Sequence, residues 1–332
     1  MATISDVARE AGVSRSTVSS VLTGRKFVRP PTRARIEAAI ERLQFSVNAG
    51  ARALATSKTM TLGVVVRFHE AEFAPALAAY LFALSDAARD QGYSIVLMTD
   101  ADGVAAVDRA IAQRQVDGLI LLSVVNDDPR LGTIAKTRFP AVLIGMPEGT
   151  RGIDAVDLDF AVGARKLVDH LADAGHDKAM FVCWPEALYA TGSTYAIRFA
   201  EAARRRAAER GVALVEQPLP VEPDLVREAL VRVVGDPTLP GAILIHNDTA
   251  AAMMPLVLRE LGLRVPQDRY VASLHSAELG AFFGIDFPSV ASEPLAVSNA
   301  AVELLMRRLT TPDAPAEARL VSPGLSVANR FA

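Results

Sequence analysis

Hydrophobic residues in the first forty-five positions recur at helical spacing in three short stretches. The apolar face of each stretch consists, in order, of Ile4, Val7, Ala8 and Ala11, then Val18, Val21 and Leu22, then Ile36, Ala39, Ile40 and Leu43. Thr3 and Asp6 form a capping box before the first stretch, and Gly12 ends it. Ser14 is placed to cap the second helix and Thr32 the third. The pattern predicts a helix-turn-helix with a third helix sharing its core.

From residue 61 onward, apolar runs of strand length alternate with amphipathic helical stretches. The predicted strands are Leu62–Val66, Ser94–Met98, Gly118–Leu122, Ala141–Ile144, Ala179–Val182, Ala242–Ile245 and Tyr270–Leu274. The predicted helices are Pro75–Asp90, Ala105–Arg114, Pro129–Thr137, Val162–Ala174, Thr194–Arg210, Pro223–Val234, Ala250–Leu261 and Val297–Leu309. Continuous apolar strands with crossover helices indicate parallel sheets covered on both faces. The pattern restarts near Ala179, so we expect two doubly wound subdomains with a ligand cleft at the carboxyl ends of their strands.

Charge is distributed unevenly along the chain. Residues 1–60 contain ten Lys or Arg and four Asp or Glu, a net charge of +6, whereas the remainder carries −9. A basic head on an acidic body is expected when one end binds phosphates, although a solvated basic face would look the same. The exposed face of the second helix favours DNA, because it consists of hydroxyls and one Arg of a size suited to the major groove. The expected DNA-binding residues of this segment are Thr3, Ser14, Arg15, Ser16, Thr17, Ser19 and Ser20.

Two segments, TISDVAREAGVSRSTVSSVLTG and TRARIEAAIERLQFSVNAGARALAT, resemble the headpiece and hinge of the lactose/galactose repressor (LacI/GalR) family. The resemblance implies that Arg15, Ser16 and Ser20 read bases, although the family usually has Arg at the third of these positions. The family's hinge helix matches Asn48–Ala55.

Within that hinge, the resemblance implies that Leu54 wedges between base pairs from the minor groove, with Asn48 and Arg52 as further DNA contacts. Gly50 interrupts the hinge helix, and Val47 stands where the family often has proline. Because glycine costs about 1 kcal/mol relative to alanine inside a helix, we expect the hinge to order only on DNA.

The body resembles the periplasmic-binding-protein-like core of the same repressors in the segments VDLDFAVGARKLVDHLADAGH, IHNDTAA and GLRVPQDRYVASL. Sugar-binding members commonly place an arginine, an asparagine and an aspartate against the ligand. The asparagine matches Asn247, but Tyr195 and His275 stand at the other two positions. The resemblance therefore predicts a ligand unlike a plain monosaccharide, such as a glycoside or an anionic or aromatic metabolite. The expected effector-binding residues are Arg67, His69, Ser123, Trp184, Tyr195, Asn247 and His275.

The expected organisation is an all-α headpiece over residues 1–45, a hinge over 46–59, and an α/β core over 60–332. Within the core we expect an N-subdomain of about 60–158 plus 290–320 and a C-subdomain of about 159–289 plus 321–332. One headpiece contacts too few bases to be selective, so we expect a homodimer on a pseudo-palindromic operator, with a tetramer left open. Whether the effector induces or corepresses is also left open.

Other classes of protein fit less well. No phosphate-binding glycine loop or nucleophile elbow is present, so we expect neither an enzyme nor a cofactor. Asp154, Asp157 and Asp159 lie close together but lack a calcium-loop glycine or histidine partners, so we expect crossover or surface roles and no metal. The lone Cys183 is expected to be a small buried residue. A solute-binding protein for import would need an export signal; none is apparent, nor is a membrane-spanning apolar run, and we expect a cytoplasmic repressor.

Overall fold

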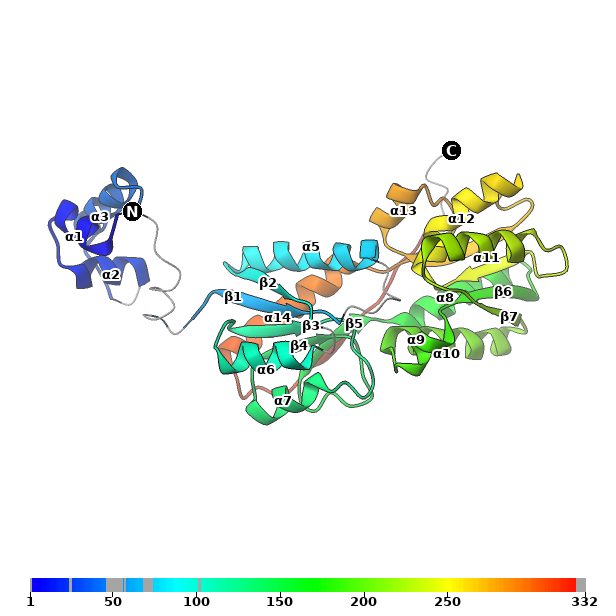
Figure 1. Ribbon diagram of the computed structural model, residues 1–332, viewed down its shortest axis with the longest axis horizontal. Helices are drawn as coiled ribbons and strands as arrows, with labels where there is room; N and C mark the ends of the chain where they lie inside the picture. Colours follow the sequence, from blue (N-terminus) through cyan, green and yellow to red (C-terminus); the bar gives the residue numbers. More distant parts are fainter. Residues whose placement is uncertain are drawn as a thin grey trace. The chain divides into compact units, whose positions relative to one another are not determined.

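The computed structural model describes residues 2–23, 26–45, 56, 58–67, 74–100 and 103–326. The chain divides between Met60 and Thr61 into two compact units (Figure 1). The regular structure described in the first unit is helical, and that of the second consists of two sheets with helices on both faces. The predicted fold class, a helical headpiece followed by two parallel-sheet subdomains, is confirmed.

The headpiece contains the helices α1 (Ile4–Ala11), α2 (Arg15–Thr23) and α3 (Pro30–Arg42). One residue of each, Val7, Val18 and Ile36, is completely buried in their common core. The capping box before α1 is present: the Asp6 N–H donates to Thr3 Oγ1 at 3.3 Å, and the Thr3 N–H donates to the Asp6 carboxylate at 2.9 Å. These contacts satisfy backbone donors that the first turn of a helix leaves unpaired.

The expected start of the third helix was wrong. The helix begins at Pro30, two residues before Thr32, and its N-cap residue Arg29 makes no side-chain capping bond. Proline at the first helical positions has a fixed φ that suits the helix, and its missing N–H would have had no partner there. Proline geometry therefore replaces the hydroxyl cap that the sequence pattern suggested.

The first subdomain of the core is built on a sheet with the strand order β11-β5-β4-β3-β1-β2, in which every pairing is parallel. Its strands are β1 (Thr61–Val65), β2 (Ser94–Met98), β3 (Gly118–Leu121), β4 (Ala141–Ile144), β5 (Asp154–Leu158) and β11 (Ala318–Val321). Its helices are α5 (Ala74–Asp90), α6 (Val104–Ala112), α7 (Arg130–Thr137) and α14 (Pro294–Thr310). Helix α5 packs against α14 on one face of the sheet, and α6 packs against α7 on the other.

The second subdomain has the strand order β12-β10-β9-β8-β6-β7, parallel except for the pair β10–β12. Its strands are β6 (Lys178–Cys183), β7 (Ala213–Pro218), β8 (Ala242–Ile245), β9 (Tyr270–His275), β10 (Ser289–Ala291) and β12 (Leu325–Ser326). Its helices are α8 (Phe160–Asp173), α9 (Glu186–Ala190), α10 (Thr194–Arg210), α11 (Pro223–Gly235), α12 (Asp248–Leu261) and α13 (Ala277–Phe283). Helices α8 and α10 cover one face and α11 and α12 the other. Cys183 is buried at the end of β6, as expected.

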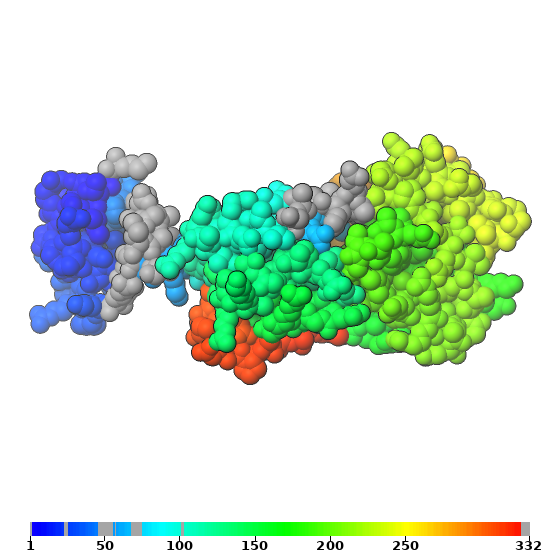
Figure 2. Space-filling model, turned by 60° about the horizontal axis from the view of Figure 1, so that its bottom comes forward, coloured from blue at the N-terminus to red at the C-terminus, as the bar shows by residue number. Residues whose placement is uncertain are grey.

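Within the described residues, the chain passes between the subdomains three times: from β5 to α8, from β10 to α14, and from β11 to β12. The orange and red residues near the carboxyl end accordingly lie on the surface of the same half as the cyan residues of α5 and β2 (Figure 2). The crossings bring the carboxyl ends of both sheets to the boundary between the subdomains.

A buried ion pair fixes one side of that boundary. Arg130 and Asp128 are both completely inaccessible as side chains, with 2.6 Å between Arg130 Nη2 and Asp128 Oδ2. The guanidinium also donates to the carbonyl of Leu122 at 2.9 Å, just after β3. Gly103, with φ of 71°, makes room for it, since a Cβ there would lie 2.8 Å from Arg130 Cδ. Arg130 therefore ties the loop after β3 to the start of α7.

We predict that Asp128→Ala lowers the free energy of unfolding of the core by about 3–5 kcal/mol, because it leaves the Arg130 charge buried without its counterion. Urea unfolding followed by the fluorescence of Trp184, the only tryptophan in the sequence, measures this in the core alone. The control Asp86→Ala removes an exposed partner of Arg89 and should change stability by less than about 1 kcal/mol. Equal losses in the two variants would contradict a special role for the buried pair.

Candidate functional site

The outer face of α2 is the candidate DNA-binding surface of the headpiece. Arg15 and Ser16 are exposed at its start, whereas Ser19 and Ser20 are half-buried further along. Arg15 makes no hydrogen bond or ion pair with any described residue of the chain. A long, uncommitted guanidinium at the first position of such a helix can reach the edge of a guanine through two parallel hydrogen bonds.

The hydroxyls around Arg15 are partly committed to local contacts. Ser14 Oγ lies 2.7 Å from Ser16 Oγ and 2.8 Å from Thr17 Oγ1, and it accepts a hydrogen bond from the Thr17 N–H. Ser20 Oγ donates to the carbonyl of Ser16 at 2.9 Å. The expected cap at Ser14 is therefore present. Hydroxyls can exchange such contacts for DNA, but at the start of α2 only Arg15 extends well beyond the backbone.

The positive charge of the headpiece is only partly neutralised within it. Ion pairs join Arg9 to Asp6, Arg33 to Glu37 and Arg42 to Glu10. The basic residues that form no ion pair within the described part of the headpiece are Arg15, Lys26, Arg29 and Arg35. These exposed cations leave a positive potential suited to a phosphate backbone.

Four expected site residues lie outside the described residues: Asn48, Arg52 and Leu54 of the hinge, and His69 after β1. Thr3 is described, but both its hydroxyl and its N–H bond to the Asp6 carboxylate in the capping box. Thr3 therefore stabilises the start of α1 in this structure.

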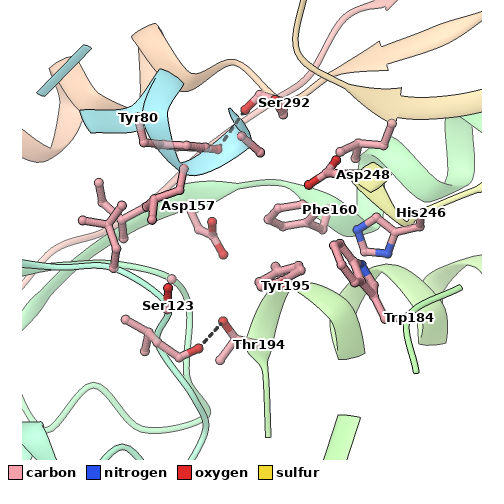
Figure 3. Close-up of a pocket in the computed structure, with 17 residues that line it drawn as sticks. Tyr80, Ser123, Asp157, Phe160, Trp184, Thr194, Tyr195, His246, Asp248 and Ser292 are labelled. Carbon is pink, nitrogen blue, oxygen red and sulfur yellow. Dashed lines mark hydrogen bonds between the residues drawn. The ribbon is translucent and has the colours of Figure 1, made fainter. Parts of the chain in front are cut away.

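The core contains a cavity at the boundary between its subdomains, with an empty volume of about 840 Å³ that includes the part open to solvent (Figure 3). Its walls come largely from the carboxyl ends of strands in both sheets and from α5, α8 and α10. Three expected effector-binding residues, Ser123, Trp184 and Tyr195, line it. The lining residues that sequence reasoning missed include Tyr80, Asp157, Phe160, Thr194, His246, Asp248 and Ser292.

Three other expected residues are not brought to the wall of this cavity. Asn247 is buried and caps α12: its Oδ1 accepts from the Ala250 N–H at 3.0 Å, and its Nδ2 donates to the carbonyl of Pro220 at 3.1 Å. His275 is buried with its Nδ1 2.7 Å from Ser273 Oγ. Arg67 is half-buried, and its Nε and Nη1 have no hydrogen-bond partner. Both Asn247 and His275 are occupied by local contacts, which explains why neither faces the space.

Asp157 projects into the cavity from β5 and forms an ion pair across the subdomain boundary. Its Oδ2 lies 2.6 Å from Nη1 of Arg198 on α10. Burial raises the pKa of Asp157 to about 7, although the Arg198 guanidinium acts against that shift. Its neighbours stabilise the fold, since Asp154 binds Arg308 and Asp159 caps α8. Asp157 lies at a crossover as expected, because β5 leads into α8, and this crossover runs beside the cavity.

Asp248 is the second carboxylate of the cavity, at the first position of α12. None of the hydrogen bonds or ion pairs among the described residues includes its carboxylate. The side chain is half-buried in the cavity wall, and this desolvation raises its pKa to about 7 with no neighbouring cation to oppose the shift. Figure 3 shows the carboxylates of Asp157 and Asp248 both directed into the cavity beside Phe160.

Aromatic rings line the cavity beside Asp248 (Figure 3). Ring centroids lie 5.8 Å apart for Trp184 and Tyr195 and 5.9 Å apart for Phe160 and Tyr195. The His246 ring stacks on Phe199 at 3.8 Å, and burial lowers its pKa to about 3, so the imidazole is neutral. Nδ1 of His246 and Nε1 of Trp184 are buried without hydrogen-bond partners.

Two hydroxyls that face the cavity hold the subdomains together. Tyr80 Oη donates to the carbonyl of Ser292 at 3.1 Å, and Thr194 Oγ1 donates to the carbonyl of Val124 at 3.1 Å (Figure 3). Beside the second contact, Val125 pairs with Ser193 in an isolated antiparallel bridge. The rim of the cavity is therefore also the contact between the subdomains.

Within the described ranges no group of three His, Cys, Asp or Glu is arranged to hold a metal ion. None of the helices among the same residues combines the length and the apolar character that a membrane crossing requires.

Comparison with known proteins gives matches in both units. The model of "Bacterial regulatory proteins, lacI family" matches residues 3–48, and that of "Periplasmic binding protein-like domain" matches residues 168–329. The "HTH-type transcriptional repressor PurR" of Haemophilus influenzae (strain PittEE) is 29% identical over 94% of this chain and 93% of its own length. The "Ribose operon repressor" of Escherichia coli (strain K12) is 27% identical over 94% of each chain.

Solved structures share the whole architecture. A lac repressor dimer bound to operator and the anti-inducer ONPF has a TM-score of 0.82 at 24% identity, covering 100% of this chain and 99% of that one. A complex of the transcriptional regulator CelR with cellobiose has a TM-score of 0.67 at 24% identity, covering 99% of each chain. At these identities the likeness establishes the fold.

We predict that Asp248→Asn stabilises the core more at pH 8 than at pH 5. The unfolded carboxyl ionises near its ordinary pKa of 3.8 and the folded one near 7, so the parent core loses stability as the pH rises through that interval. Asparagine does not ionise, so the stability difference between variant and parent should grow by on the order of 1 kcal/mol, after a discount for solvent in the cavity. Urea unfolding at the two pH values, followed by Trp184 fluorescence, measures it.

The matched control for that experiment is Asp224→Asn, which removes an exposed carboxylate from the first turn of α11. It should shift stability equally at both pH values, apart from the small effect of a charge near a helix start. If the Asp248 variant also shifts stability equally at both pH values, burial does not raise the pKa of the Asp248 carboxyl.

Proposed function

We propose that this chain, which belongs to the lacI family of bacterial regulatory proteins, is a repressor. Its affinity for operator DNA is controlled by a small molecule bound in the cavity of its core. The predicted family resemblance is confirmed. The protein is a DNA-binding regulator of transcription and, like its family, has no enzymatic role. One observation carries the proposal: a helix-turn-helix presenting an uncommitted Arg15 is joined to a two-subdomain core that encloses a cavity.

The DNA-binding unit is a homodimer in this proposal, acting in the cytoplasm on a pseudo-palindromic operator. A single α2 reaches only a few base pairs, and two related half-sites supply the missing selectivity. Exposed apolar side chains on the edge strand β2 and the adjacent α5, namely Val96, Leu97 and Phe82, support self-association. The relative crystallised as an operator-bound dimer has the same fold.

The proposed DNA-contacting and linking segments follow the sequence: a headpiece over 1–45, a hinge over 46–59 and a core from residue 60. Arg15, Ser16 and Ser20 read bases in the major groove, and Leu54 enters the minor groove as an apolar wedge. Unstacking a base step costs a few kcal/mol, so two wedges in a dimer are easier to sustain than one. The effector acts by changing the relation of the two subdomains within each core, and through it the spacing of the hinges.

The proposed function is tested by selecting binding sites from random duplexes with the purified full-length protein. We expect enrichment of a sequence with two inverted half-sites, because the two α2 helices of a dimer are related by symmetry. Retention of every duplex in equal measure against a polyanion competitor at moderate salt would refute the proposal.

We predict that Arg15→Ala weakens binding to the selected operator by about 1–3 kcal/mol and relaxes the preference at one position of each half-site, because a bidentate base contact is lost. Fluorescence anisotropy with the operator and with single-substituted operators measures both effects. Arg35→Ala, which removes an exposed and unpaired charge from α3, is the control and should weaken all duplexes by a similar, smaller factor. An unchanged sequence preference in the Arg15 variant would show that Arg15 contacts only the backbone.

A further inference from the structure

The carboxylate of Asp248 has no partner although it lies in the wall of a largely apolar cavity. Asp157, the other carboxylate of the wall, is neutralised by Arg198 at 2.6 Å, whereas no ion pair among the described residues includes Asp248. Removing a carboxylate from water without a counterion is unfavourable, and a bound cation would relieve that penalty. The cavity therefore carries one uncompensated negative charge when Asp248 is ionised.

The neighbourhood of Tyr80 shows that this negative potential extends across the cavity. Burial raises the pKa of Tyr80, and the negative charges of Asp157, Asp248 and Glu293 raise it further. The described residues that line the cavity include no Lys and no Arg. An anionic ligand would thus meet repulsion without a cation to bind, and we no longer expect the anionic metabolite that the sequence suggested.

The remaining walls suit a flat or compact apolar body. Trp184, Tyr195 and Phe160 lie within 6 Å of a neighbouring ring, as judged by their centroids. Aromatic faces attract cations and stack on other rings. The hydroxyls of Tyr80 and Thr194 already donate to backbone carbonyls, so neither O–H is available to donate to a ligand.

Two further groups indicate that the space is built for a ligand. Nε1 of Trp184 and Nδ1 of His246 are unpartnered, and these side chains are only 2% and 3% exposed. Buried polar groups are rarely left unpaired in proteins. The imidazole is neutral, so its Nδ1 can accept a hydrogen bond from an ammonium group, while the indole N–H can donate to an acceptor elsewhere on the same ligand.

We propose that the effector is a protonated amine on an aromatic or compact apolar body, with its ammonium group paired to Asp248 and its body packed against Phe160, Trp184 and Tyr195. The assignment rests on the proposed function, since it names the class of molecule that occupies that function's cavity. An ammonium group there supplies the missing counterion and can donate to Nδ1 of His246.

Three probes that share one ring and differ in charge test the proposal: phenethylamine, 2-phenylethanol and phenylacetate. Trp184 is the only tryptophan of the chain and lies in the cavity wall, so its fluorescence reports occupancy in the full-length protein. Phenethylamine should bind about tenfold or more tightly than 2-phenylethanol, as expected for a desolvated charge pair. Phenylacetate should produce no change at the same concentrations.

Asp248→Asn should reduce the affinity for phenethylamine to that for 2-phenylethanol and leave the alcohol unaffected, while the control Asp224→Asn changes neither. The proposal is overturned if phenylacetate or the alcohol binds as well as the amine, if the Asp248 variant retains the preference, or if no probe alters the fluorescence.

The duplex selection described above, made with the same preparation, separates the two proposals. If an operator is enriched but the amine does not bind, only the proposed ligand class is refuted. If no duplex is preferred, the proposed repressor function is refuted, whichever probes bind.

Discussion

The cavity of the core depends on one constraint, which is that the chain crosses between the subdomains three times along the same boundary. Parallel strands all end at one edge of their sheet, so the crossings bring the two carboxyl edges together. Every residue that directly follows a strand is then a candidate for the shared wall, as Leu122, Trp184, His246 and Ser292 illustrate. The position of the cavity is thus a property of the topology, and only its chemistry is left to individual side chains.

The core places charged side chains where water is scarce, both in the cavity wall and elsewhere, with two different outcomes. The pairs Arg130–Asp128 and Arg198–Asp157 are each internally neutral, so their removal from water is compensated by short charge-assisted contacts. Asp248 has no such compensation and raises the free energy of the empty core once it ionises. A charged group that lowers the stability of the empty protein is typical of a binding site, because a bound ligand of opposite charge restores that stability.

The sequence predicted those parts of the fold that depend on local patterns. Apolar runs located all seven expected strands to within one residue, and Ser94–Met98 is matched at both ends. Strand β5 was missed because its sequence DAVDL places an acid near each end, and only long-range partners such as Arg308 make their burial tolerable. The same reason hid Asp157 from the candidate site. The prediction that Asn247 contacts the effector had the opposite problem. Asn247 lies near the end of a strand, as expected, but its side chain caps α12 and does not line the cavity.

The overlap between the ligand space and the subdomain contacts explains how occupancy can be transmitted. Asp157 belongs to the first subdomain and its partner Arg198 to the second, and the contact of Thr194 with Val124 crosses the same boundary. A molecule that touches both walls necessarily prefers one relative position of the subdomains, since its contacts cannot be equally good in all of them. Coupling between two sites is reciprocal, so an operator that favours one position must change the affinity for the effector by the same factor. A charge bound beside Asp248 is well placed for this role because the Asp157–Arg198 pair at the same cavity is ionic and largely desolvated, and such a contact loses strength steeply when its geometry changes.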